Sequence, residues 1–597
     1  MKTAEPSPRA SAAAEPRREL TLRAVGTALA VAALIGASYP YVVLKIGYGP
    51  NISVVSAFFG YLALGVLGLF TGERGTRWEN NLVQTAGTAA GQAGFMCVLL
   101  AAFDMLNAKP ELGFSIHLTT LQIFSWLTVA GLLGVLLAVP LRRHYIDEED
   151  LPFPDGTAAG ETMLVLDLDR REAAQRVRAL GLGLALSAAL AAARDLHWRL
   201  KLAGGRVLRL LPLVPGELGL GPHGTALRMG TEVSLLSFGS GLLVGLRVTL
   251  SMGLGMILAW IVAPPWLTGA GVVPEQTFPD VLKWVMWPAT GLMVSGGLTA
   301  LALKWKVVVR SFEGLSRLDV AAGGREEFPM RLVIPGSIGL AILLAVVQKI
   351  SLGFPFWLTA VSLLLSLPLM LVGTRVLGET NWAPISALAN LMQAVFAVLV
   401  PGHIPVNMIG SGMSGTVAAN GEHLMQDYRA GQIVGANYRH LTIVQLLAVP
   451  VGSLAVALAY PALRARYGVG GEGLSSPISV KWAGFAELLA KGFSTLPRGC
   501  LTALGLALAA GVLLTLLEAD PRRRRWLPSP TAVGLGMLIP GFAVLPMVIG
   551  GVAQALWARS SPRTEESYRV PLASGLIAGE ALLVLLLSLL AMAGLRP

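Results

Sequence analysis

The chain has 597 residues, of which 54% are hydrophobic and only 14% are charged. A soluble protein carries about 25% charged residues, so this composition excludes an ordinary soluble globular protein. Apolar runs of about 18 or more residues recur from end to end, and each is long enough to cross the ~30 Å hydrocarbon core of a lipid bilayer. The sequence therefore predicts an all-α polytopic membrane protein.

The net charge of +11 and the two cysteines bear on which partners and metal sites the protein can have. The charge is typical of the cytoplasmic Lys/Arg bias of an inserted protein, so we expect no nucleic-acid partner. Cys97 and Cys500 both fall inside hydrophobic segments. They offer neither a disulfide framework nor a zinc-binding spacing, and no metal site or cofactor is predicted.

The first 19 residues are polar, basic and rich in Pro and Ala. The apolar stretch that follows is too long for the hydrophobic region of a signal peptide. We therefore expect residues 1–19 to form a disordered cytoplasmic tail and residues 20–597 to form a single membrane domain.

About 14–16 membrane segments are expected, some of them broken or re-entrant helices. The first candidates are Leu22–Val43, Ile52–Phe70, Asn81–Leu106, Leu118–Pro140, Ala173–Ala192, Val233–Leu250, Leu254–Leu267 and Val281–Leu303. The others are Leu332–Val347, Phe356–Val376, Ile385–Val400, Leu441–Tyr460, Cys500–Leu517, Ala532–Leu556 and Leu572–Ala593.

The distribution of basic residues predicts the orientation of the chain. Arginines precede the first span and follow the second and fourth, whereas the intervening loops are nearly free of Lys and Arg. The positive-inside rule therefore places the N-terminus in the cytoplasm of a multi-pass protein. After the fifth span the rule weakens, because the basic stretch 194–211 would be external.

Short segments of similar sequence in the two parts of the chain suggest two repeat halves that meet around residues 310–330. "LPFPDGTAAGETMLVLDLD" (Leu151–Asp169) and "GTVAANGEHLMQDYRAG" (Gly415–Gly431) share a Gly-Thr pair, two alanines, a Gly-Glu and a later Asp. Such similar segments are typical of duplicated membrane proteins, although chance can also produce matches this short.

One predicted helix carries a row of polar side chains. Asn81, Thr85, Thr88 and Gln92 are spaced by three or four residues, so they share one helix face. This face either lines a polar cavity inside the membrane or holds neighbouring helices together by hydrogen bonds.

Charged residues inside apolar segments are costly and often functional. Arg247 is isolated, so it marks a boundary between two short helices, binds an acidic group of a ligand, or pairs with a buried carboxylate. Glu580 is isolated as well and can carry a proton if it is buried. Glu161, Glu379 and Glu422 follow glycines in polar turns, where surface placement is expected; His423 adjoins Glu422.

The sequence contains no convincing motif of a soluble enzyme. "GLGPHG" (Gly219–Gly224) has no preceding strand, and neither a Walker A loop nor His-Glu-x-x-His occurs. A membrane enzyme would require Asp147, Asp150 and Asp155 to converge on a metal ion. We therefore expect no enzymatic activity.

Several motifs resemble the oligopeptide transporter family, in particular its bacterial and yellow stripe-like branch. They are "WENNLVQTAGTAAG", "LPFPDGTAAGE", "LLVGLR", "GETNWAPISALANLMQAVFAVLVPG", "GTVAANGEHLMQDYRAGQIVGANYRH" and "LASGLIAGEALL". The resemblance runs from about Ala24 to Ala593. It implies about sixteen helices with a pseudo-repeat and secondary active transport, driven by protons as the coupling ion.

The polar stripe, the charges within apolar segments and the matched motifs together give two sets of candidate residues. The substrate-binding candidates are Asn80, Asn81, Gln84, Thr88, Gln92, Arg247, Glu379 and Asn381. The proton-coupling candidates are Glu161, Glu422, His423, Asp427 and Glu580. The sequence departs from the family pattern at "NYRHL" (Asn437–Leu441) and at Asn381, where bacterial relatives commonly have Asp, and both departures bear on substrate specificity.

The leading expectation is a proton-coupled importer of oligopeptides in the cell inner (plasma) membrane. The alternative is an importer of metal chelates with siderophore or nicotianamine-like ligands, which this sequence does not distinguish from the first. A passive channel is a third reading, favoured only if continuous helices surround an open pore. Two copies associating as a homodimer is also compatible with the sequence.

Overall fold

The computed structural model describes residues 19–46, 52–167, 174–195, 199–201, 207–209, 213–303, 327–469, 474, 476–490 and 496–592. Residues 1–18 of the expected tail and most of the expected junction at 310–330 lie outside these ranges. The disorder of the tail and the duplication into halves stay predictions.

The described part of the chain is almost entirely helical, as predicted. Its first helices are α1 Leu22–Ile46, α2 Ile52–Thr71, α3 Arg77–Phe95, α4 Cys97–Asn107, α5 Thr120–Ala138, α6 Pro154–Asp167, α7 Ala174–Asp195, α8 Gly221–Ala226, α9 Leu235–Val244, α10 Leu246–Ile257, α11 Ala263–Gly269 and α12 Phe278–Leu303. The later helices are α14 Met330–Leu352, α15 Phe356–Thr380, α16 Ile385–Leu399, α17 Ile404–Val434, α18 Tyr438–Tyr467, α19 Pro477–Ala490, α20 Cys500–Glu518, α21 Pro521–Arg524, α22 Pro530–Leu538, α23 Gly541–Ser560 and α24 Pro562–Met592.

The strands are short and lie between α7 and α9. β1 (Arg199–Lys201) pairs antiparallel with β2 (Val207–Arg209), and β3 (Glu217–Gly219) pairs antiparallel with β4 (Gly230–Glu232). Among the described residues, eleven helices are long and apolar enough to cross a membrane, and two shorter apolar helices accompany them. The chain is an all-α polytopic membrane protein.

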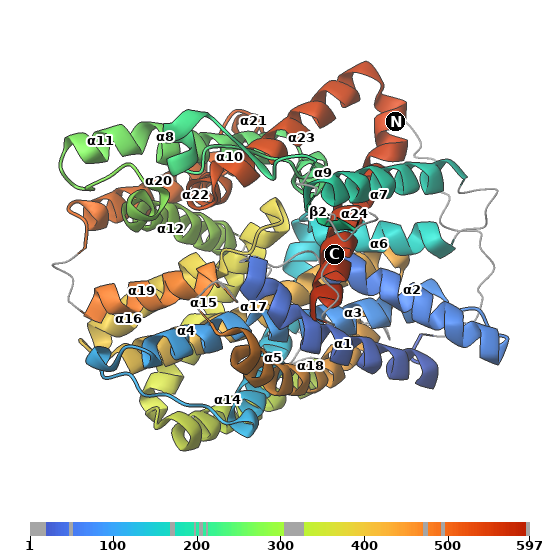
Figure 1. Ribbon diagram of the computed structural model, residues 1–597, viewed down its shortest axis with the longest axis horizontal. Helices are drawn as coiled ribbons and strands as arrows, with labels where there is room; N and C mark the ends of the chain where they lie inside the picture. The colour runs from blue at the N-terminus through green and yellow to red at the C-terminus, as the bar shows by residue number, and fades with distance from the viewer. Residues whose placement is uncertain are drawn as a thin grey trace.

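The helices pack in two groups that do not follow chain order (Figure 1). In one group, drawn in the lower part of the figure, α1–α6 pack with α14–α18. In the other group α7 packs on α24, α9 on α23, α10 on α22, and α12 on both α20 and α22. The two groups meet where α6 contacts α24 and where α12 contacts α15.

The stretch around Gly415–Gly431, which we expected to lie between spans, instead belongs to α17, a helix of 31 residues. It is packed by α3, α5, α6, α15 and α16. A helix surrounded by other helices needs no lipid-facing apolar stripe, so hydropathy alone does not reveal it. Small residues permit this packing: a Cβ on Gly134 of α5 would lie 2.2 Å from the Val417 carbonyl oxygen of α17.

Helix α3 begins at a capping box that also fixes α1. The Thr76 side chain accepts from the Glu79 N–H, and the Glu79 side chain accepts from the Thr76 N–H. The same Glu79 carboxylate binds Arg23 of α1 at 2.7 Å (Nη2 to Oε2). The first acid of the "WENN" motif therefore has a structural role at the entrance of α3.

The basic residues after α5 form ion pairs with an acid that precedes α14. Arg142 and Arg143 bind Glu327, which precedes α14, at 2.6 and 2.7 Å. Burial alone would raise the pKa of Glu327, but hydrogen bonds and charge from the two arginines lower that pKa below its usual value. The end of α5 and the start of α14 therefore lie at the same face.

The crossing of α7 and α24 generates a prediction. A Cβ on Gly183 would lie 2.5 Å from the Leu572 carbonyl oxygen, whereas nothing lies within 4 Å of a Cβ on Gly181 in the same helix. We expect Gly183→Ala to cost about 1–3 kcal/mol through overpacking. Gly181→Ala should leave the melting temperature unchanged or slightly higher, because alanine favours helix. Thermal unfolding of the two variants in detergent checks this, and equal melting temperatures would contradict it.

Candidate functional site

The polar face of α3 meets a buried acid of α17. The Gln84 Nε2 atom donates to Asp427 Oδ1 at 2.7 Å and lies 3.0 Å from Thr88 Oγ1. The Asn81 Nδ2 atom donates to Gln84 Oε1 at 2.8 Å. Asn81 and Thr88 of the predicted stripe therefore join Gln84 in a hydrogen-bonded chain that ends on Asp427, and all four side chains are buried.

This α3–α17 cluster is not saturated with hydrogen bonds. Within the described residues, Asn81 Oδ1, Thr85 Oγ1, Asp427 Oδ2 and Gln92 Nε2 are buried atoms without a hydrogen-bond partner. Buried polar atoms nearly always have a partner, so such atoms call for water, an ion or a ligand. Asn80 belongs elsewhere, because its Oδ1 faces Gly60 of α2.

Glu422 is a second acid on α17. We expected it at the surface, but it is only 1% exposed. Its Oε1 packs so closely on Gly373 of α15 that a Cβ there would lie 1.8 Å away. Its Oε2 has no hydrogen-bond partner among the described residues. The expectation was wrong because neighbouring helices enclose most of α17, including the side that carries Glu422. His423 beside it is half-buried.

Glu379, also expected at the surface, is buried at the end of α15 and belongs to a network of ion pairs. It binds Arg375 at 3.0 Å (Oε1 to Nη2) and accepts through Oε2 from Ser529 at 3.0 Å and Thr531 at 2.6 Å. Arg375 also binds Glu149. The network joins α15 to the start of α22, across the boundary between the two helix groups.

Asn381 ends α15 in the left-handed conformation, with φ of 67°. Its Nδ2 donates to Asp155 Oδ1 at 2.6 Å, and its Oδ1 accepts from the Asp155 N–H at 3.0 Å. An aspartate here could not donate to Asp155. The amide at 381 therefore fits the acid that this chain has at 155.

Arg247 lies in the first turn of α10, directly after a break at Gly245, where φ is 88°. Its Nε donates to the carbonyl oxygens of Arg524 (2.8 Å) and Leu527 (3.1 Å), and Nη2 binds Glu518. For Arg247 we expected a boundary between two short helices, an acidic group of a ligand, or a carboxylate partner. The structure shows the first and the third together. Its role in substrate binding stays a prediction.

Glu580 of α24 is buried but not isolated. It binds Arg194 at 2.8 Å, accepts from Ser234 Oγ at 2.9 and 3.0 Å, and accepts from the Leu236 N–H at 3.1 Å. These bonds hold the start of α9. Glu161 lies partly exposed on α6. The partners of Glu580 lie on α7 and at the start of α9, not in the hydrogen-bonded chain between α3 and α17.

Three acids considered for a metal-dependent enzyme do not converge. Asp147 pairs with Arg142 at 2.8 Å, Asp150 pairs with Arg429 at 2.6 Å, and Asp155 binds Asn381. In the part of the chain that the structure describes, no group of three or more His, Cys, Asp or Glu side chains could hold a metal ion.

Sequence reasoning missed Arg375 and Glu149, which join Glu379 in the ion-pair network, and Glu518, which pairs with Arg247. Arg375 falls at the end of an apolar stretch and resembles an interfacial anchor, and both glutamates follow or precede charged loops. The spacing of Arg375 and Glu379, four residues apart on one helix, was the one available signal.

Comparisons with known proteins agree with this architecture. The family described as "OPT oligopeptide transporter protein" matches residues 19–591. A probable metal-nicotianamine transporter of Oryza sativa subsp. japonica is 24% identical, covering 97% of this chain and 92% of that protein. A putative oligopeptide transporter of Saccharomyces cerevisiae is 23% identical over 95% of each chain. A probable metal-nicotianamine transporter of Arabidopsis thaliana is 22% identical, covering 97% and 93%. The chain belongs to the oligopeptide transporter family and is a multi-pass membrane transporter, not an enzyme.

Proposed function

We propose that the protein is a proton-coupled secondary active transporter that imports small solutes built from amino acids. The observation that carries this proposal is Asp427, which is buried between α3 and α17 and has no cationic partner among the described residues. We further propose that it works in the inner membrane with a cytoplasmic N-terminus. Association as a homodimer stays a prediction.

The environment of Asp427 suits an acid that loads and releases a proton. Burying an unpaired charge is expensive, so an ionised Asp427 requires a compensating charge. A proton supplied from one side of the membrane meets that need, and the Gln84 amide can accept or donate as the carboxyl changes state. Glu422, five residues earlier on α17, is the second candidate for the same reason.

The other proton-coupling candidates fit less well. Glu580 already has an arginine partner, and Glu161 is partly exposed. His423 adjoins Glu422 and can exchange protons with it only at the half-buried side of α17. We therefore assign coupling to Asp427 first and Glu422 second.

Two substrate classes share the required chemistry. Oligopeptides and chelates of nicotianamine-like ligands both present amines, carboxylates and amide-like groups that need buried polar partners. The oligopeptide is the first candidate, and the names of the plant relatives favour the chelate. Because the described residues bring together no set of metal ligands, a metal would be recognised through its chelator.

An uptake screen tests this proposal. We expect purified protein in liposomes with an inwardly directed pH gradient to accumulate either labelled di- and tripeptides or ferric and ferrous chelates. Collapsing the gradient with a protonophore should reduce accumulation at least about tenfold, since coupling supplies the driving force. Accumulation that persists after collapse would refute proton coupling, and equilibration without accumulation in either case would indicate a passive channel.

Asp427→Asn should separate coupling from substrate passage. The amide cannot carry the proton, so we expect loss of gradient-driven accumulation while exchange of labelled for unlabelled substrate across the membrane persists. Asp150→Asn is the matched control, because its carboxylate is 74% exposed and exposed ion pairs contribute little. Normal accumulation by Asp427→Asn would transfer the coupling role to another acid.

Arg247 and Glu518 call for a double-mutant test. Arg247→Ala leaves Glu518 without its cation and should cost roughly 1–3 kcal/mol, allowing for partial exposure of the pair. We expect Arg247→Ala/Glu518→Ala to regain most of the lost melting temperature and uptake, because both charges are then absent. A double variant that is stable yet inactive would instead support direct binding of a substrate carboxylate by Arg247.

A further inference from the structure

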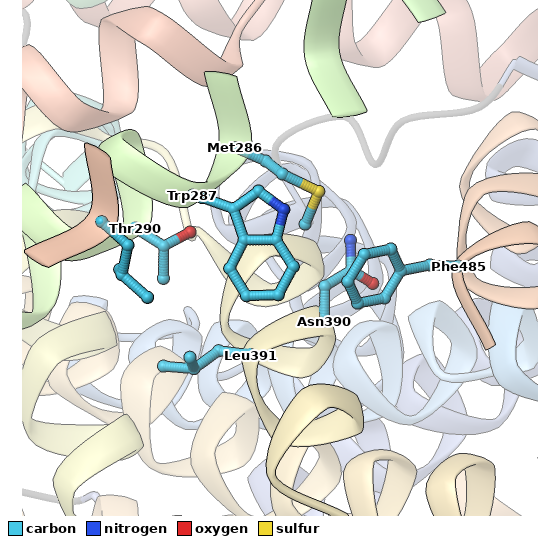
Figure 2. Close-up of a pocket in the computed structure, with 7 residues that line it drawn as sticks. Met286, Trp287, Thr290, Asn390, Leu391 and Phe485 are labelled. Atoms are coloured by element: carbon cyan, nitrogen blue, oxygen red, sulfur yellow. The ribbon is translucent and has the colours of Figure 1, made fainter. Parts of the chain in front are cut away.

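A small, partly open cavity lies where α12, α16, α19 and α20 meet (Figure 2). Its volume is about 10 Å³, and its lining includes Trp287 and Thr290 of α12, Asn390 of α16 and Phe485 of α19. Figure 2 shows these side chains turned toward one another. A cavity of this size holds at most one water molecule.

Three polar atoms at the cavity have no hydrogen-bond partner in the described ranges: Trp287 Nε1, Thr290 Oγ1 and Asn390 Oδ1. Trp287 and Thr290 are each only 4% exposed. Trp260 donates to the Ile539 carbonyl and Trp284 to the Arg498 carbonyl, both at 3.1 Å, whereas the indole nitrogen of Trp482 on α19 is also without a partner among the described residues. Three such atoms that line one cavity together call for a shared partner, either a water molecule or a polar group of a ligand.

The three atoms define the ligand by their chemistry. The indole N–H donates only, the threonine hydroxyl donates or accepts, and the Asn390 carbonyl oxygen accepts only. A carboxylate alone would face the Asn390 oxygen, and an ammonium alone would face the indole N–H. A unit with a carbonyl oxygen and an adjacent N–H satisfies both. The rings of Trp287 and Phe485, 5.9 Å apart at 50°, leave apolar faces for an aliphatic neighbour.

The cavity lies between the two helix groups, which is a suitable place for a substrate site. α12 belongs to one helix group, whereas α16 belongs with α17 in the other. Further polar atoms without a hydrogen-bond partner lie beyond the cavity. Gln393 Oε1 is one turn further along α16. At the start of α17, both the nitrogen and the oxygen of the Asn407 amide lack a partner within the described part of the chain. Asn407 and Asp427 are twenty residues apart on α17, which is about 30 Å along a helix.

We propose that Trp287, Thr290 and Asn390 form a substrate-recognition subsite that binds a carbonyl and N–H unit of the transported solute when the two helix groups separate. The inference rests on the proposed function, since it assigns the substrate class of the same transporter. It names residues that the motif stripe on α3 does not include. In the present closed arrangement the subsite admits nothing larger than water.

Binding measurements without a gradient test the subsite independently of coupling. Labelled trialanine and the iron–nicotianamine chelate serve as probes, added to the full-length protein in detergent. Trp287→Phe keeps an aromatic side chain, although a smaller one, and removes the N–H donor, whereas Thr290→Val keeps the volume and removes the hydroxyl. We expect each to weaken binding of the recognised probe about tenfold, the effect of losing one hydrogen bond to a buried group. Trp266→Phe, with 58% of that side chain exposed on α11, is the matched control.

Thermal stability provides a second readout with opposite sign. Removing an unpartnered buried hydroxyl removes a desolvation cost, so Thr290→Val should raise the melting temperature of the substrate-free protein while weakening binding. A lower melting temperature together with unchanged binding would overturn the proposal and leave a structural water only. If Trp287→Phe does not fold, Thr290→Val decides alone.

The two proposals fail in different ways. Wild-type protein that binds a probe but accumulates it without regard to the proton gradient refutes coupling and leaves the subsite standing. Gradient-driven accumulation together with wild-type affinity in both variants refutes the subsite and leaves coupling standing. Wild-type protein that neither binds nor transports either probe refutes the proposed substrate classes and the subsite with them.

Discussion

The contact between the Gln84 amide and the Asp427 carboxylate is the interaction on which the membrane-embedded core depends. A carboxylate inside a helix bundle requires either a cation, a set of donors or a proton. Here one oxygen receives an amide donor and the other is left open within the described residues. α17 can carry such a group only because α3, α5, α6, α15 and α16 shield it from lipid.

The buried charges divide into two kinds. Glu379, Glu518 and Glu580 each have an arginine and hold helices together: α15 to α22, α20 to α10, and α24 to the start of α9. Asp427 and Glu422 have no such partner in the described ranges, and both lie on α17. Paired charges fix the scaffold because breaking them strands a charge. Acids without a cation are the ones free to change protonation at small structural cost.

The sequence revealed local features and missed those that depend on distant contacts. The stripe from Asn81 to Gln92 was predictable because helix periodicity alone places its members on one face. By contrast, Asp427, which accepts a hydrogen bond from Gln84, lies 343 residues further along the chain than Gln84. Glu518, which pairs with Arg247, lies 271 residues from it. No spacing rule connects such positions. α17 escaped notice because a helix enclosed by protein has no reason to be as apolar as one that faces lipid.

The polar regions are placed at different positions along one helix, and this placement bears on mechanism. Asp427 lies near the end of α17, and the open amide of Asn407 lies near its start, beside the α16 side chains that lead to Asn390. α16 and α17 belong to one helix group, while Trp287 and the Glu379 partners Ser529 and Thr531 belong to the other. A shift between the groups would therefore change the surroundings of both the solute and the Glu379 network. If α17 takes up a proton at Asp427 and the solute binds near Asn407, as proposed, the two events are coupled through such a shift, because about 30 Å of helix separates the two residues.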